Sequence, residues 1–180
     1  MNAIGIIIAK ENSNRFPGKN YFNVNGKFMF AHNVDLLKEC RFIDSVFVAT
    51  NSPIIKDYCL KNGIFLIDRG PNVSADEEPF LSVLKFVYQS LNIKADIIIS
   101  ILANTINHNQ ESLENAFTLM KNCPELNEIR SFDKYGMENG IMFFRENVVL
   151  TAPAISSNMG SVFSGGREIH YKREVENAEI

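Results

Sequence analysis

Residues 4–20 read IGIIIAKENSNRFPGKN, an apolar run followed directly by a polar loop. Residues 4–8 are isoleucines interrupted only by Gly5, which is typical of a central strand covered on both faces. The loop that follows carries cations, a hydroxyl and free main-chain N–H groups. Ligands of open α/β sheets bind where such loops leave the carboxyl ends of strands. Backbone donors and cations together suit a polyphosphate, although the GxxxxGK[ST] and GxGxxG motifs are both absent.

Length and composition indicate one ordinary globular domain. The 180 residues predict a single domain, 1–180, and a hydrophobic share of 46% is enough for a packed core. A net charge of −3 argues against general affinity for nucleic acid. The cysteines show neither CxxC nor Cys/His metal spacing, so we expect reduced thiols in a cytoplasmic protein. The sequence shows neither a secretory signal pattern nor an apolar run near the roughly 20 residues of a membrane-spanning helix.

Strands and helices are predicted to alternate after the first loop. Asn25-Gly26 favours a tight type I′ turn between two short strands. Periodicity then predicts helices at 28–40, 54–61, 81–91 and 110–122, and strands at 46–49, 64–67, 97–101 and 141–144. This order predicts an α/β fold with a single doubly wound, mostly parallel sheet and helices on both faces. We expect 4–8, 46–49 and 97–101 to be its buried central strands.

Three later regions carry more specific expectations. Residues 74–78 are predicted to cap and begin a helix with acids, where the helix dipole favours them. Residues 158–167 are rich in glycine and serine and are expected to form a mobile loop. His108 follows the fourth predicted strand, and we expect it to be an exposed loop residue.

The order of residues in the first loop resembles a known signature. AKENSNRFPGKN is similar to A-R-x-G-S-K-R-x-P-G-K-N of the cytidylyltransferases that activate acidic sugars, which include the CMP-sialic acid and CMP-Kdo synthetases. The matching residues are Ala9, Ser13, Arg15, Pro17, Gly18, Lys19 and Asn20. Lys10, Asn12 and Asn14 depart from the signature, where the family has Arg, Gly and Lys. Weaker similarity continues in the same order along nearly the whole chain, including an Asn-Gly pair at Asn139-Gly140.

In that family the first loop wraps the triphosphate of CTP. The resemblance implies the same work for Ser13, Arg15 and Lys19, with Arg15 and Lys19 as the catalytic pair on phosphate oxygens. The nucleotide-binding set that it implies is Ala9, Lys10, Ser13, Arg15, Lys19, Asn20, Asn104 and Thr105. Asn104 and Thr105 lie in a loop where the family has Gln-Pro-Thr-Ser-Pro. Here Leu102 replaces the glutamine, and both prolines are absent.

The family closes with two aspartates that hold Mg²⁺. Glu168 and His170 occupy those positions and are the metal ligands that the resemblance implies, while Asn51 replaces another family acid. One carboxylate with substrate phosphates can suffice for Mg²⁺, whereas an imidazole is a softer ligand that suits Mn²⁺ better. The expected cofactor is therefore a weakly bound Mg²⁺ or Mn²⁺.

The resemblance implies a nucleotidyltransferase that moves CMP from CTP to sialic acid, Kdo or a related acidic sugar and releases pyrophosphate. The alternative is a catalytically impaired member of the same fold that binds a nucleotide or a sugar. An unrelated protein with a similar loop would not keep the matches in order along the chain. The expected partners are CTP and an acidic sugar, without nucleic acid or membrane. Only a short segment separates Cys123 from Asn139, where the family has a dimer-forming excursion, so we expect a monomer or a small-interface dimer.

Overall fold

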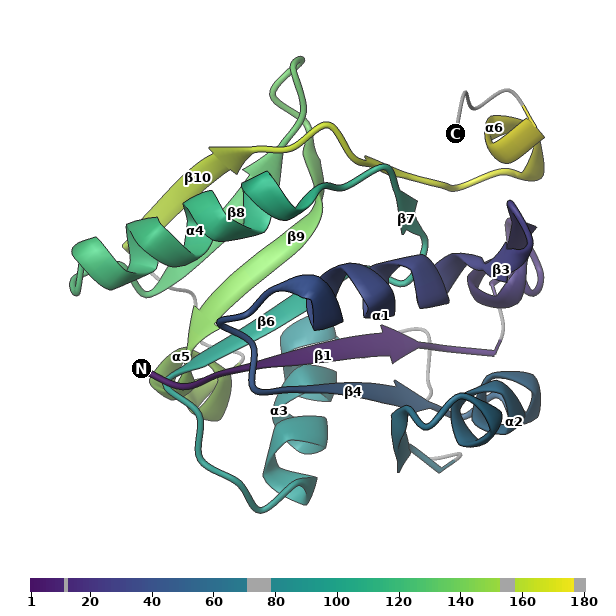
Figure 1. The fold of residues 1–180 in the computed structure, drawn as a ribbon, viewed down its shortest axis with the longest axis horizontal. Helices are drawn as coiled ribbons and strands as arrows, with labels where there is room; N and C mark the ends of the chain where they lie inside the picture. The colour runs from purple at the N-terminus through teal and green to yellow at the C-terminus, as the bar shows by residue number, and fades with distance from the viewer. Residues whose placement is uncertain (12, 71–78, 153–157, 177–180) are drawn as a thin grey trace.

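The computed structural model describes residues 1–11, 13–70, 79–152 and 158–176. A seven-stranded sheet runs through these residues in the order β10-β8-β9-β6-β1-β4-β5 (Figure 1). Its strands are β1 (Ala3–Ala9), β4 (Ser45–Thr50), β5 (Phe65–Asp68), β6 (Ile97–Ile101), β8 (Glu128–Phe132), β9 (Glu138–Arg145) and β10 (Met159–Phe163). Two small antiparallel pairs stand apart from it, β2 (Asn23–Val24) with β3 (Lys27–Phe28), and β7 (Thr105–Ile106) with β11 (Arg167–Glu168).

The main sheet is mostly parallel. β1 pairs in parallel with both β4 and β6, β4 with β5, and β8 with β10. Only β9, among the described strands of this sheet, runs antiparallel to its two neighbours, β6 and β8. In register, Ala9 at the end of β1 lies beside Thr50 at the end of β4. The loops that leave these strands therefore emerge at one edge of the sheet.

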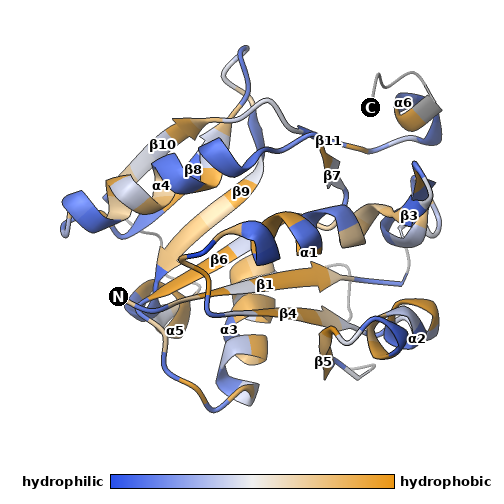
Figure 2. Cartoon of the chain, in the orientation of Figure 1, coloured by the Kyte–Doolittle hydropathy of each residue, from blue (hydrophilic) through white to orange (hydrophobic). Residues whose placement is uncertain are grey.

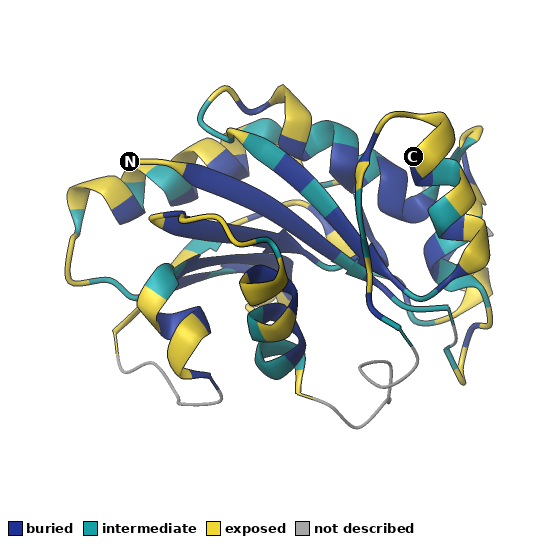
Figure 3. Cartoon of the chain, turned by 90° about the horizontal axis from the view of Figure 1, so that it is seen from below, coloured by how far each residue is buried: buried dark blue, intermediate teal, exposed yellow. Residues whose placement is uncertain are grey.

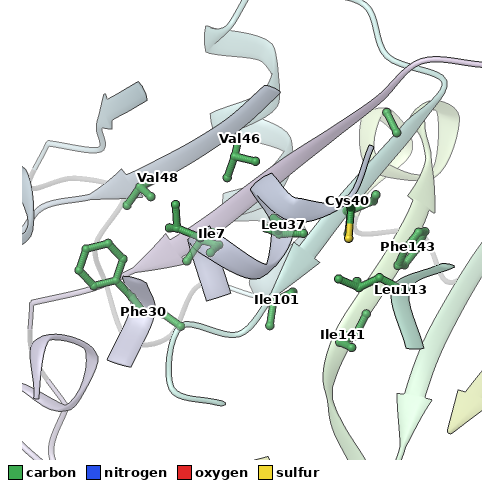
Figure 4. Packing of buried hydrophobic residues seen from close by; sticks show 14 of the residues in the cluster. Ile7, Phe30, Leu37, Cys40, Val46, Val48, Ile101, Leu113, Ile141 and Phe143 are labelled. Atoms are coloured by element: carbon green, nitrogen blue, oxygen red, sulfur yellow. The ribbon is translucent and has the colours of Figure 1, made fainter. Parts of the chain in front are cut away.

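Helices cover both faces of the sheet (Figure 1). The helices are α1 (Met29–Glu39), α2 (Pro53–Lys61), α3 (Phe80–Ser90), α4 (Gln110–Asn122), α5 (Glu146–Thr151) and α6 (Lys172–Glu176), with a 3-10 turn at Lys19–Tyr21. α1, α2 and α4 contribute to one buried cluster, around Ile7, Leu37 and Phe143 (Figure 4). α3 and α5 build a second cluster on the opposite face, around Ile6 and Phe144. The predicted doubly wound architecture is confirmed.

The predicted central strands are confirmed for β1 and β6, whereas β4 lies next to the edge strand β5 and its Phe47 is only half-buried. All five residues of β6 are buried, and β1 is buried apart from the half-buried Ile8 (Figure 3). Fully burying an isoleucine side chain stabilises the fold by about 1.5–3 kcal/mol, so this run of isoleucines is a major stabilising element. None of the described helices combines the length and apolar character that crossing a membrane requires.

Local predictions fared unevenly. The Asn25-Gly26 turn is confirmed, with φ of 50° and 82° as a type I′ turn requires. Residues 158–167 were expected to be a loop, but they contain β10, an edge strand that pairs with β8. Edge pairing needs main-chain groups and little apolar content, which explains the error. The cap predicted at residues 74–78 lies outside the described residues.

Candidate functional site

The chain turns from apolar to polar where β1 ends, and the segment after it forms a closed loop (Figure 2). The Asn20 side-chain amide donates to the main-chain oxygen of Lys10 over 2.9 Å. The Glu11 N–H donates to Asn51 Oδ1 over 2.9 Å, and the Tyr21 hydroxyl donates to the Glu11 carboxylate over 3.1 Å. These bonds hold the beginning of the loop against its end. Asn51 thus anchors the loop.

The turn before Lys19 depends on glycine. Gly18 has φ of +72°, and a Cβ built on it would lie 2.8 Å from the Tyr21 ring. A side chain at this position would meet both the left-handed backbone penalty and the aromatic ring. Phe16 is buried and packs edge-to-face on Phe22, with ring centroids 5.2 Å apart. The loop is therefore a packed structure with a defined path, and its cations are presented from a fixed frame.

Two adjoining cavities lie over this loop and share Lys10 and Lys19 in their walls. The first, of about 180 Å³, has a polar side and an apolar floor. Its polar side is formed by Lys10, Lys19, Asn20, Arg69 and Asn104, and its floor by Ile8, Phe80, Val83, Leu102 and Ala103. The second, of about 240 Å³, is lined by Lys10, Ser13, Asn14, Arg15, Lys19 and His170. We call the two cavities together the loop cleft. It joins an apolar compartment to a cationic one.

Positive charge accumulates in the loop cleft. Burial lowers the pKa of Lys19 below its ordinary value; Glu168 opposes this shift, and the nearby charges of Lys10 and Arg15 reinforce it. Arg69, which directly follows β5, is buried, and burial lowers its pKa as well. Cations that are partly desolvated and close to one another are stabilised by an anion. The cleft is therefore suited to a ligand that carries several negative charges.

Glu168 and His170 approach the cleft on a second segment. Residues 164–170, which we call the strap, cross from the end of β10 to α6 and pair with β7 through β11. The side-chain amide of Asn104 donates to Glu168 Oε1 and to the main-chain oxygen of Ile169, each over 2.9 Å. Glu168 Oε2 lies 3.6 Å from His170 Nε2. Asn104, Glu168 and His170 are therefore brought together beside Lys19.

The donor set at the strap fits a metal ion only in part. Glu168 offers a carboxylate that is 29% exposed, and His170 an imidazole that is 38% exposed. Within the described residues, no group of three or more His, Cys, Asp or Glu side chains could hold a metal ion. Mg²⁺ often binds through one or two carboxylates with phosphate oxygens and waters. This pair therefore fits a metal that the substrate helps to hold.

Some predicted residues lie elsewhere. Thr105 is fully buried, where its hydroxyl donates to the Leu102 carbonyl over 2.8 Å and accepts from the Asn33 amide over 3.1 Å. Ala9 is buried at the end of β1. His108, expected to be exposed, is half-buried beside Ser164, its Nδ1 lying 2.7 Å from the serine hydroxyl. The burial of His108 could not be predicted from the sequence, because the strap that covers it comes from the far end of the chain.

Several residues that line the cleft were not predicted, and Arg69 and Phe80 are the largest of them. Arg69 and Phe80 line the first cavity from the two ends of the segment between β5 and α3. An arginine placed directly after a strand at the ligand-binding edge was the available signal for Arg69. Nothing in the pattern around Phe80 distinguished it from an ordinary helix residue.

Comparisons with known proteins agree with this geometry. A protein-family model described as cytidylyltransferase matches residues 4–172. The N-acylneuraminate cytidylyltransferase of Streptococcus agalactiae serotype V is 34% identical over 87 residues, which are 47% of this chain and 21% of that protein. A Helicobacter pylori protein named as a pseudaminic acid cytidylyltransferase and hydrolase is 25% identical over 159 residues, 82% of this chain and 31% of that one. The chain thus spans less than a third of the length of either relative.

A solved structure shows the same fold over almost the full length. A CMP:2-keto-3-deoxy-manno-octonic acid synthetase complexed with CTP superposes with a TM-score of 0.80 and 17% identity. The superposition covers 98% of this chain and 96% of that one. At this identity the likeness concerns the fold, and the site has to be argued from the residues of this chain.

Proposed function

This chain belongs to the cytidylyltransferase family, and from that premise we propose that it transfers CMP from CTP to an acidic sugar and releases pyrophosphate. The observation that carries the proposal is the loop cleft itself. Lys10, Arg15 and Lys19 line it at the carboxyl end of β1, beside an apolar compartment. A triphosphate needs several cations at one place, and a base and sugar need apolar and hydrogen-bonding surface next to it.

The proposed reaction is a displacement at the α-phosphorus of CTP. A hydroxyl of the acceptor sugar attacks phosphorus and releases its proton to solvent, the bond to the bridging oxygen breaks, and pyrophosphate leaves with the electron pair. Arg15 and Lys19 act on the phosphate oxygens, where they stabilise charge on the leaving group. Ala9, Lys10, Ser13 and Asn20 frame the loop, and Asn104 approaches from the other wall. Thr105 acts indirectly, by holding the segment that carries Asn104.

A divalent cation would be held by Glu168 and His170 together with phosphate oxygens. It would neutralise charge on the triphosphate, which is the contribution of such ions to phosphoryl chemistry. Because one ligand is an imidazole, we propose weak Mg²⁺ binding and better support by Mn²⁺.

The acceptor, the assembly and the extent of the domain belong to the same proposal. The acceptor is sialic acid, Kdo or a related acidic sugar, and residues 1–180 act as one nucleotidyltransferase-like domain. The chain works in solution as a monomer or as a dimer with a small interface, since the β8–β9 hairpin turns within residues 133–137.

A second candidate is a catalytically impaired member of the family that binds the nucleotide or sugar without turnover. Two observations favour it: the described residues contain no group of three or more His, Cys, Asp or Glu side chains that could hold a metal ion, and the apolar Leu102 lines the cleft. A pyrophosphate-release assay with CTP, a panel of acidic sugars and either Mg²⁺ or Mn²⁺ separates the two candidates. Release that depends on the sugar supports transfer. Calorimetric binding of CTP without release supports the impaired form, and the absence of both contradicts the family-based function.

A further inference from the structure

Asn139-Gly140 is a motif of the sequence that does not line the loop cleft. Asn139 is buried near the start of β9, where the pairing with β8 shifts its register. We infer that Asn139 is a positioning residue, which holds the strap so that Glu168 and His170 reach the loop cleft. The part of this inference that concerns metal and nucleotide rests on the proposed function.

Asn139 joins the sheet to the strap through its side-chain amide. Its Nδ2 donates to the main-chain oxygen of Ser164 over 2.8 Å and to that of Gly166 over 2.7 Å. The two carbonyls belong to the first half of the strap, and Glu168 follows Gly166 by two residues. This side chain therefore restrains the main chain immediately before the proposed metal ligands, alongside the bond from the Ser164 N–H to the Phe132 oxygen.

The orientation of this amide is itself determined. Ser131 Oγ accepts the N–H of Ile141 over 2.9 Å, so its hydroxyl hydrogen is available to donate to Asn139 Oδ1, which lies 2.6 Å away. With its oxygen engaged in this way, the amide can present only its NH₂ group to the strap. The bonding pattern thus excludes the flipped amide, in which an oxygen would face two carbonyl oxygens.

The strap has little room to move on its other side. His108 Nδ1 lies 2.7 Å from Ser164 Oγ, and a Cβ built on Gly166 would lie 2.0 Å from that imidazole. Gly140, next to Asn139, has φ of +105°, and a Cβ there would lie 2.7 Å from the Thr105 methyl group. The Asn-Gly pair therefore does two separate jobs. Its asparagine ties the strap, and its glycine lets β9 pass close to the segment that pairs with the strap.

This arrangement leads to a specific expectation for metal binding. Partners that orient metal ligands from outside typically change metal affinity by about 10- to 100-fold when they are removed. Asn139→Asp keeps the shape and the acceptor for Ser131 but places a carboxylate against two carbonyl oxygens. We expect it to release the strap and to raise the apparent Mn²⁺ requirement about tenfold or more. The affinity for CTP measured without metal should change much less.

Two further variants guard against a simple folding defect. Ser131→Ala leaves Asn139 in place but removes the group that orients its amide, so we expect a smaller change in the same direction. Tyr88→Phe is the matched control. The Tyr88 hydroxyl donates to Glu146 and accepts from the buried N–H of Ala95, at the α3–α5 side of the sheet. Its loss should lower the midpoint of unfolding without affecting the strap.

The first readout needs no activity. Hydrogen exchange of the main-chain amides at residues 164–169 should accelerate in Asn139→Asp and Ser131→Ala but not in Tyr88→Phe. Unchanged exchange in both strap variants would overturn the inference. The second readout is the affinity for Mn²⁺ in the presence of CTP, measured through the paramagnetic relaxation of water protons. A loss of Mn²⁺ affinity confined to the strap variants supports the positioning role, and an equal loss in Tyr88→Phe refutes it.

The two proposals can fail separately. If the unmodified chain binds Mn²⁺ with CTP but releases no pyrophosphate, transfer is disproved while the positioning role is still measured by affinity. If the unmodified chain binds no Mn²⁺ under any condition, the positioning role for a metal site is wrong even where exchange shows a tied strap.

Discussion

Substituting Gly18 by alanine tests whether the first loop must be packed to work. Gly18 has φ of +72°, and a Cβ at this position would meet the Tyr21 ring carbons at 2.8 and 2.9 Å and the hydroxyl oxygen at 3.0 Å. The left-handed backbone alone costs alanine about 1–2 kcal/mol. Displacing the ring adds an overpacking cost of about 1–3 kcal/mol. We therefore expect Gly18→Ala to lower the free energy of unfolding by about 2–5 kcal/mol.

Gly26→Ala provides the matched control. Gly26 has φ of +82°, and a Cβ there would have nothing within 4 Å. We expect Gly26→Ala to lower the free energy of unfolding only by the cost of the left-handed backbone, about 1–2 kcal/mol. Urea denaturation of both variants measures the difference. In a Tyr21→Ala background, Gly18→Ala should cost no more than Gly26→Ala, because the ring that its Cβ would meet is gone. The effects of substitutions at contacting residues are not additive.

The same variant should affect the nucleotide. Gly18 directly precedes Lys19, and a displaced Tyr21 also loses its hydrogen bond to Glu11. We expect Gly18→Ala to weaken CTP binding about tenfold by calorimetry, which corresponds to about 1.4 kcal/mol, while Gly26→Ala leaves it unchanged. Equal unfolding losses in the two glycine variants, with equal CTP affinities, would refute the claim that the loop works as a packed frame.

Further predictions concern the phosphate-binding cations, the metal ligands, the pH dependence of stability and the oligomeric state. Arg15→Ala or Lys19→Ala should each weaken CTP binding about tenfold or more, since a charged hydrogen bond contributes about 1.5–3 kcal/mol; unchanged calorimetric affinity in both places the phosphates elsewhere. His170→Asp should raise Mg²⁺-supported pyrophosphate release, whereas brisk Mg²⁺ turnover that survives Glu168→Ala means that other groups hold the metal. Burial lowers the pKa of His108 to about 4, below its ordinary value of 6.5, so the unfolded chain binds the extra proton between these values. The free energy of unfolding should therefore fall as the pH drops from 6.5 to 4, by up to about 3 kcal/mol at 1.36 kcal/mol per pKa unit, and His108→Gln should flatten this fall in urea titrations. Light scattering should report 20.4 kDa or a readily dissociating dimer, and a dimer that persists on dilution would contradict this.

The central part of the fold could be predicted because its signals are local. The isoleucine runs of β1 and β6 are almost entirely apolar, with Ser100 the one polar residue in β6, and such runs are typical of strands covered on both faces. α4 was predicted with the bounds that the structure shows, Gln110–Asn122, because apolar period and end signals agree there. The Asn25-Gly26 turn needed only the two residues that favour positive φ.

β8 and β10 were not predicted because their stability comes from pairing. β8 reads EIRSF, and its Glu128 and Arg130 form an ion pair with each other, which no apolar pattern reveals. β10 reads MGSVF and lies at the edge, where hydrogen bonds to β8 define the strand. Both strands follow from contacts between residues far apart in the chain, and single-sequence periodicity carries no record of those contacts.

The candidate site divides in the same way. The first loop was predicted as a unit, because its residues are contiguous and resemble a known signature. The wall formed by Arg69 and Phe80 and the burial of His108 depend on how distant segments meet. Asn139 was noticed as part of a motif, but its role required the carbonyls of Ser164 and Gly166, 25 and 27 residues further along the chain.

The proposed phosphate and metal ligands are linked by charge before any substrate binds. Burial lowers the pKa of Lys19, Glu168 raises it, and Lys10 and Arg15 lower it further. A bound triphosphate would take over the neutralisation of Lys19 and leave the Glu168 carboxylate to a divalent cation. A cation bridging Glu168 and the phosphates would in turn reduce the repulsion between these two anions. Each ligand therefore favours the other by the same factor, as linkage requires. Under the proposed function, such coupling would let Glu168 and His170 hold a divalent cation together with the phosphates of the substrate.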